Sequence, residues 1–390
     1  MSVSRLLLAL LLARLLVACG GARPTPTRAD PEASSAAAAD AWSRLAPERA
    51  LTLAEEAIAQ GGGDDAREIA ARAALATGEP DRAVRALAGV GDDALLRLRA
   101  AAQIAADDRE GAIATLEAAA RRARVEDPWA SAVLPALRAA RAPYGIEGDD
   151  ATLPLLDLPL PVIAVRVDTV ETLAVLGTGA HFAVLDPSIR NAPGAIDELG
   201  LGALRVRSVP HVVRSLEPLS AALGRPIGMV IGADLLLRLA AVIDGPAGRV
   251  RVHASPPPST EGTGAGLLPL SGSFLAVEAQ LDGAPAWLTL DTAGLFPLAL
   301  TPSASDALEG WRETDGVELV LLDVRIGALE VRELPAIRGL LDDGHARAIG
   351  APVSGSLGWG LLGQLVIAFD PRARRIRFDG SHFEESSADP

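Results

Sequence analysis

Apolar residues recur at three- and four-residue spacing between residues 36 and 145, which predicts a helical domain there. Leu51, Ala54 and Ile58 mark one face of a predicted helix, and Leu95 and Leu98 mark part of another. Gly-rich or Pro-containing breaks separate the predicted helices at residues 61–63, 78–80, 89–91 and 127–128. The pattern predicts an all-α region of paired helices.

Two of these predicted helices resemble the second helix of tetratricopeptide-like hairpins. Their openings begin at Gly78 and Asp108, and each contains a small residue, Ala83 or Ala112, that lets paired helices approach closely. The two alanines are 29 residues apart, whereas that repeat has a period of about 34. We therefore predict a helical-hairpin repeat and leave open whether it is a true tetratricopeptide array. Such a region serves as a scaffold or as a groove for a protein partner.

From Leu153 the pattern changes to short β-rich runs separated by turns, and it continues in this way to Asp379. The Pro-rich segment at 254–265 predicts a linker between two mostly β lobes at 153–253 and 266–380. Residues 381–390 remain as a tail.

The two predicted lobes repeat one order of motifs. Gly232 is followed twelve residues later by Asp244, and Gly358 is followed at the same interval by Asp370. Each Asp precedes a run in which Arg alternates with apolar residues. Agreement in order, spacing and apolar phase indicates an internal duplication.

Upstream in each lobe, an apolar strand leads into a turn of small residues. The turn is Gly177-Thr178-Gly179 in the first lobe and begins with Asp291-Thr292 in the second. Together with the downstream Gly motifs, these turns resemble the retropepsin-like and pepsin-like aspartic peptidases over roughly residues 155–380. The resemblance implies a two-lobed acid-protease fold. In each lobe of that family, an apolar-apolar-Gly segment crosses beneath an Asp-Thr/Ser-Gly turn.

The chemistry of that family needs one carboxylate from each lobe. Two adjacent carboxylates share a proton, so that one activates a water molecule while the other polarises the scissile carbonyl. The resemblance assigns Asp291 to this dyad, but Gly177 stands where the first lobe should supply its Asp. It also implies that Thr178 and Thr292 hydrogen-bond across the lobe interface. We therefore expect a catalytically degenerate site.

The sequence positions no second acid to replace the missing one. Asp168 lies before the relevant strand and Asp186 lies beyond the turn, so neither is expected to face Asp291. His181 follows closely, and we expect it to be a solvent-exposed loop residue. The family pattern also includes a substrate-covering hairpin, for which Leu204–Val213 is the candidate, although it contains no Tyr.

The N-terminus resembles a bacterial lipoprotein signal. Arg5 precedes an apolar stretch at residues 6–17 that is too short to span a bilayer. The stretch ends in a lipobox-like run before Cys19, although Arg14 departs from that pattern. An ordinary signal peptide followed by an incidental cysteine is the alternative.

The lipobox implies cleavage after residues 1–18, lipid attachment to Cys19 and a flexible tether at 19–35. Cys19 is the only cysteine in the chain, and a lipidated thiol needs no disulfide partner. We therefore expect a lipid-anchored protein of the bacterial cell envelope that faces the periplasm. Gly20 replaces the Asp that retains many lipoproteins in the inner membrane, which favours the outer membrane.

Charge and composition limit the classes of partner that this protein can bind. The formal charge of −14 argues against a nucleic-acid partner. The five His residues show no metal-ligand spacing, so no metal or cofactor is predicted. The leading hypothesis is a lipid-anchored protein that binds an extended peptide between its lobes without cutting it. The alternatives are an active aspartic endopeptidase, for example through two Asp291 residues from paired molecules, and a non-catalytic scaffold of an envelope complex.

Overall fold

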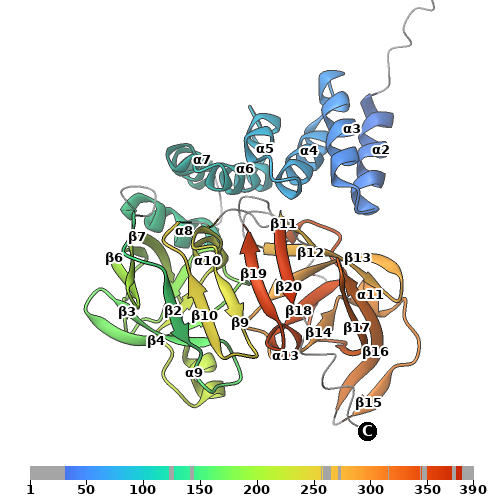
Figure 1. Ribbon diagram of the computed structural model, residues 1–390. Coiled ribbons are helices and arrows are strands. Elements are labelled where there is room, and N and C mark those ends of the chain that lie inside the picture. Colours follow the sequence, from blue (N-terminus) through green and yellow to red (C-terminus); the bar gives the residue numbers. More distant parts are fainter. Residues whose placement is uncertain are drawn as a thin grey trace, which may run out of the picture.

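A helical region followed by two mostly β lobes makes up the computed structural model of this chain (Figure 1), which confirms the predicted fold class. The predicted signal peptide, Cys19, most of the tether, most of the linker and the tail lie outside the described residues. The structure describes residues 31–122, 127–140, 145–255, 257, 265–270, 274–314, 316–342, 344, 349–370 and 375–379.

Four helices of the N-terminal region, α4, α5, α6 and α8, begin at or just after the breaks predicted from the sequence. Asp92 caps α6 by accepting a hydrogen bond from the Ala94 amide at 2.9 Å, and Asp127 caps α8 in the same way. The first helix starts at Pro31, so the last five residues of the predicted tether are helical. The helices are α2 (Pro31–Ser43), α3 (Pro47–Ala59), α4 (Asp64–Ala76), α5 (Pro80–Ala86), α6 (Asp93–Ala105), α7 (Arg109–Arg122) and α8 (Pro128–Ala139).

Lobe 1 begins earlier than predicted, because two strands before Leu153 already pair with it. β1 pairs with β7, and β2 pairs with β10. The elements of lobe 1 are β1 (Gly145–Glu147), β2 (Ala151–Pro154), β3 (Val162–Val167), β4 (Val170–Leu176), β5 (Ala183–Leu185), β6 (Gly194–Leu201), β7 (Leu204–Val213), α9 (Glu217–Leu223), β8 (Met229–Ile231), α10 (Ala233–Arg238), β9 (Val242–Asp244) and β10 (Arg249–Val252).

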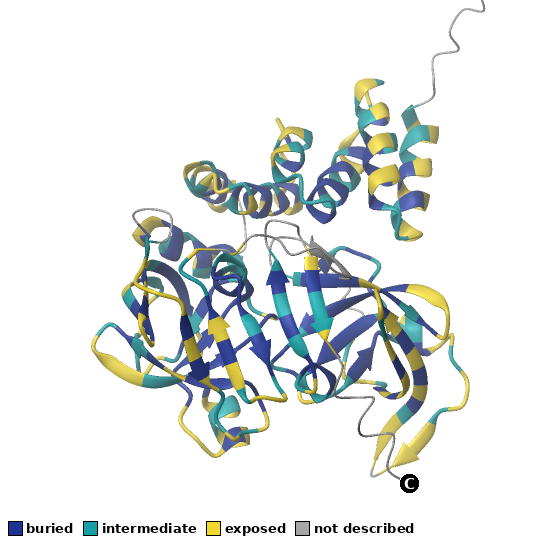
Figure 2. Ribbon diagram, viewed as in Figure 1, coloured by how far each residue is buried: buried dark blue, intermediate teal, exposed yellow. Residues whose placement is uncertain are grey.

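Lobe 2 repeats this arrangement with longer strands. Its elements are β11 (Ala265–Leu270), β12 (Phe274–Leu281), β13 (Ala284–Asp291), β14 (Leu298–Leu300), α11 (Pro302–Ser305), β15 (Arg312–Thr314), β16 (Val317–Ile326), β17 (Leu329–Ile337), β18 (Gly355–Gly358), α13 (Trp359–Leu362), β19 (Val366–Asp370) and β20 (Arg375–Asp379). Figure 2 shows buried positions filling both lobes and exposed positions on the outer loops and helix faces.

The same strand crossing occurs in both lobes and confirms the duplication. β8 runs parallel to β4 in lobe 1, with Val175 opposite Val230. β18 runs parallel to β13 in lobe 2, with Thr289 opposite Ser356. In each lobe a further short strand, β5 or β14, lies antiparallel on the other side of the crossing strand. The turn that follows β4 or β13 is therefore held from below by the crossing strand.

A sheet shared by the two lobes joins them along their length. β9 of lobe 1 pairs antiparallel with β19 of lobe 2, with Ile243 opposite Ile367. The sheet runs in the order β11-β20-β19-β9-β10-β2 across the boundary. Asp244 ends β9 and accepts hydrogen bonds from the Ala247 amide and the Arg249 side chain, so it fixes the turn between β9 and β10. The lobes therefore form one unit.

The helical region packs on both lobes. Trp42 of α2 meets Trp287 of β13 edge to face, with ring centroids 5.2 Å apart. At the other end, Val133 of α8 shares a buried cluster with Phe182 and Val212 of lobe 1. The helices therefore bridge the two lobes on one side of the molecule (Figure 1). None of the helices in the described ranges is both long and apolar enough to cross a bilayer.

Candidate functional site

Asp291 lies at the end of β13, in the turn that the crossing strand supports. Its Oδ1 accepts a hydrogen bond from the Ala293 amide at 3.1 Å, which is a common role for a turn carboxylate. The side chain is half-buried. Its carboxylate lies over the turn of lobe 1, because a Cβ atom built at Gly179 would be 3.2 Å from Oδ1. The two predicted turns are therefore in contact.

Thr178 and Thr292 exchange hydrogen bonds across the lobe interface. The Thr178 hydroxyl donates to the Leu290 carbonyl at 2.8 Å and accepts from the Thr292 amide at 3.0 Å. The Thr292 hydroxyl donates to the Leu176 carbonyl at 2.5 Å and accepts from the Thr178 amide at 3.0 Å. Both threonines are fully buried, at 0% and 1% exposure, so these bonds are shielded from water. The pattern is the cross-lobe contact implied by the sequence resemblance.

Backbone hydrogen bonds show which positions of the two turns are equivalent. The Ala180 amide donates to the Gly177 carbonyl at 3.2 Å, and the Gly294 amide donates to the Asp291 carbonyl at 3.0 Å. Gly177 and Asp291 therefore occupy matching positions. The same match places Ala293 where the family motif has Gly, so both turns depart from that motif.

The space beside Gly177 is filled by an apolar side chain. A Cβ atom built at Gly177 would lie only 2.6 Å from Cγ1 of Val230 on the crossing strand. In lobe 2 the matching position of the crossing strand is Ser356, which is smaller and lies beneath the strand that ends in Asp291. Val230 also belongs to a buried apolar cluster against which Ala293 packs. A side chain at 177 would therefore require Val230 to shift.

The other acids considered from the sequence have separate roles. Asp168 forms an ion pair with Arg190. Asp186 accepts hydrogen bonds from the Ser188 hydroxyl and the Leu216 amide, which hold the pKa of that carboxyl below its usual range. Both acids fix loops of lobe 1, in agreement with the expectation that neither would replace the missing carboxylate.

The candidate covering hairpin is part of the lobe 1 barrel. Leu204–Val213 forms β7, which pairs with β6 through a turn at Gly202. The turn packs on β2, since a Cβ atom at Gly202 would lie 3.3 Å from Leu153 and 3.4 Å from Ala151. Leu204 itself is fully buried. The hairpin therefore builds the core of lobe 1, and the expectation that it covers the turn at Gly177 is not supported.

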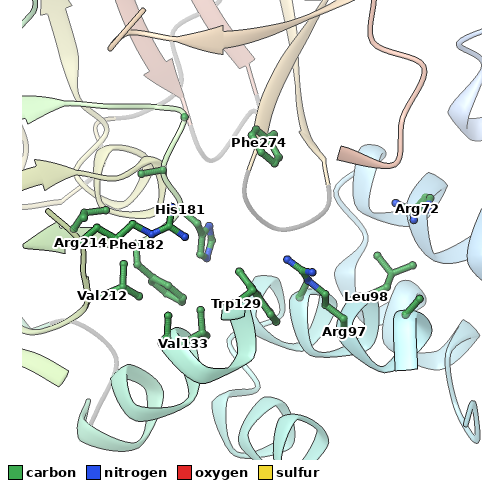
Figure 3. A pocket seen from close by; sticks show the side chains of 16 residues that line it. Arg72, Arg97, Leu98, Trp129, Val133, His181, Phe182, Val212, Arg214 and Phe274 are labelled. Atoms are coloured by element: carbon green, nitrogen blue, oxygen red, sulfur yellow. The ribbon is translucent and has the colours of Figure 1, made fainter. Parts of the chain in front are cut away.

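His181 was expected to be a solvent-exposed loop residue, and this expectation is wrong. Its ring is half-buried, and its Nε2 is buried without a hydrogen-bond partner among the described residues. Burial lowers the pKa of His181. His181 lines a cavity together with residues of the helical region (Figure 3). The sequence contains no local signal for this docking.

Comparisons with known proteins find only distant similarity. No protein-family model matches the sequence, and no curated protein matches it. Among solved structures, a retropepsin-like aspartic protease from Rickettsia conorii is 18% identical, with 24% of this chain and 71% of that chain covered and a TM-score of 0.19. The aspartic proteinase from Irpex lacteus is 11% identical, with 59% and 96% covered and a TM-score of 0.37.

Basic 7S globulin from soybean is similar to the same extent. It is 10% identical, with 60% of this chain and 95% of that chain covered and a TM-score of 0.37. The duplication of the two lobes is shown by the strand pairing within this chain.

The reciprocal hydrogen bonds of Thr178 and Thr292 predict a large loss of stability when either hydroxyl is removed. Thr178→Val leaves the Leu290 carbonyl and the Thr292 amide buried without their partner, which should lower the free energy of unfolding by about 2–4 kcal/mol. Thr178→Ser keeps the hydroxyl and should cost about 1 kcal/mol. Thr289→Val is the matched control, since it removes one hydrogen bond within lobe 2. Denaturant unfolding measures all three; equal losses for Thr178→Val and Thr289→Val would contradict the cross-lobe role.

Proposed function

We propose that this chain is a lipid-anchored protein of the bacterial cell envelope that binds an extended peptide between its lobes and does not cleave it. The proposal takes the aspartic-protease-like fold as a binding scaffold whose catalytic pair is incomplete. Attachment through Cys19, with the folded part facing the periplasm, is part of the proposal and is supported by the lipobox-like sequence.

One observation supports a degenerate catalytic pair: a side chain at position 177 would meet Val230. Aspartic peptidase chemistry needs a second carboxylate opposite Asp291, because one group must donate a proton while the other accepts one. The position that would supply it has no side chain, and Val230 occupies the adjacent space at 2.6 Å from a built Cβ. The hydrogen bonds between Thr178 and Thr292, which align the two turns, are nevertheless all present. This combination favours binding over hydrolysis.

The helical region supports a binding role because it lies over the turn that follows Gly177 rather than away from it. Arg97 of α6 and Trp129 of α8 line the same cavity as Ala180 of lobe 1. A peptide entering there would contact the helices and a lobe together. We include a protein partner on the outer faces of the helices as a secondary part of the proposal.

The function is tested by measuring binding and cleavage on the same samples. Protein beginning at residue 24, which keeps every described residue, is mixed with a library of unstructured peptides between pH 3 and 7. We expect saturable binding with no new peptide fragments by mass spectrometry, both in the native chain and in Asp291→Asn. Cleavage by the native chain that disappears in Asp291→Asn would show an active peptidase. Absence of binding would favour the scaffold alternative.

A second carboxylate should be tolerated only when the neighbouring side chain is reduced. Gly177→Asp alone should lower the free energy of unfolding by about 2–4 kcal/mol, because it overpacks the space beside Val230. In a Val230→Ser background, which copies Ser356 of lobe 2, the same change should cost at least about 1 kcal/mol less. Val209→Ser is the control background, since Val209 is buried in lobe 1 but lies beyond 4 Å of the built Cβ. An equal cost in both backgrounds would contradict the steric account.

The anchor is tested by cell fractionation. We expect the native protein in the membrane fraction and the Cys19→Ser variant in the soluble fraction, because several acyl chains at about 0.8 kcal/mol per buried CH₂ provide the attachment. Arg23→Ser, four residues away in the sequence, is the control and should stay with the membrane. Retention of Cys19→Ser in the membrane would contradict lipid anchoring at this residue.

A further inference from the structure

A cavity of about 350 Å³ lies where the helical region faces the turn of lobe 1 (Figure 3). Arg97 and Trp129 reach it from the helices, and Gly179–Phe182 and Arg214 reach it from lobe 1. Phe274, at the start of β12, contributes from lobe 2. All three parts of the molecule therefore meet at this cavity.

The cavity is positively charged although the chain is acidic. None of the described residues that line it is Asp or Glu, whereas the formal charge of the whole chain is −14. Arg72 also lines it but already forms an ion pair with Glu68 at 2.7 Å. Arg97 and Arg214 are more available. A site of this charge selects an anion.

Two guanidinium groups face the cavity with few competing carboxylates. Arg97 lies over the Trp129 ring at 5.0 Å, and its nearest acid among the described residues is Asp127 at 3.8 Å. Arg214 has no side-chain ion pair with any described residue. Figure 3 shows both guanidinium groups turned toward the cavity from its two sides, with His181 between them in this view. Guanidinium groups bind carboxylates through paired, charge-assisted hydrogen bonds.

His181 lines the cavity with its ring. Its Nε2 is buried without a partner among the described residues, so this nitrogen is not open to a ligand in the cavity. Its main chain is fixed, because the Asp234 amide donates to the His181 carbonyl at 3.1 Å and that carbonyl packs on Gly232. The charged groups that can reach a ligand here are therefore Arg97 and Arg214.

The remaining walls are apolar. Trp129, Phe182 and Val212 surround the charged groups, and Phe274 closes one side. Such a mixture of a large apolar lining and a few convergent polar groups is typical of sites for small amphipathic ligands. The volume admits one aromatic or large aliphatic group together with its carboxylate.

We propose that this cavity binds a carboxylate carried by an aromatic or large aliphatic group, such as the C-terminal residue of a peptide. The carboxylate lies between Arg97 and Arg214, while the apolar group packs on Trp129 and Phe182. The inference deepens the proposed function and rests on it for the peptide source. Gly179 lines the cavity and also contacts Asp291, so a peptide held here by its end would extend past the two turns.

Calorimetric titration with four probes distinguishes the sources of the carboxylate. The probes are N-acetyl-phenylalanine, its amide, and a pentapeptide ending in Phe with a free or an amidated C-terminus. We expect both acids to bind roughly 10- to 100-fold more tightly than the matching amides. Equal binding of acids and amides, no binding of either acid, or equal binding of inorganic phosphate would overturn the inference.

Variants assign the binding to the named side chains. Arg214→Gln should weaken the binding of both acids roughly 10-fold or more, and Arg214→Lys should weaken it less, because it keeps the charge but loses the paired hydrogen bonds. Arg225→Gln, an exposed arginine of the same lobe outside the cavity, is the control. Unchanged affinity in Arg214→Gln, with circular dichroism showing a native fold, would overturn the inference.

Different results would reject the proposed peptide-binding function and the carboxylate site. Binding of N-acetyl-phenylalanine without binding of the pentapeptide acid would support the cavity site and reject a peptide as its occupant. Binding of library peptides regardless of their C-terminal group would support the proposed function and reject the carboxylate site.

Discussion

The reciprocal hydrogen bonding of Thr178 and Thr292 is the constraint on which the rest of the interface depends. Each hydroxyl satisfies a backbone carbonyl and a backbone amide of the opposite lobe, all buried. Buried backbone groups must be paired, so these four bonds fix how the two turns face each other. The β9–β19 pairing then holds the lobes together at a second place. Together they hold Asp291 next to the turn of lobe 1.

The helical region connects the two lobes at a third place, beside the turns. It contacts lobe 2 through Trp42 and lobe 1 through Val133, so it spans the boundary rather than extending from one lobe. Aromatic and aliphatic burial at both ends makes independent motion of the helices costly. The surface beside the turns is consequently shaped by side chains from three parts of the chain.

Much of this architecture follows from periodicity and repetition. Helical spacing located α3 and α6, and the matched intervals after Gly232 and Gly358 identified the two lobes before any contact was known. Local patterns could not show that Val230 fills the space beside Gly177, because strand register brings together residues far apart in the chain. For the same reason His181 was assigned to solvent: the helices that cover it belong to a separate predicted domain. The start of lobe 1 was missed because β1 and β2 are short and pair only with distant strands.

The packing around residue 177 also couples two positions that lie far apart in the chain. An acid introduced at 177 while Val230 is kept would overpack a buried space. Reducing Val230 alone would leave an unfilled space in a buried apolar cluster. Each single change is destabilising, whereas the two changes together compensate for one another, so the two positions change at low cost only as a pair.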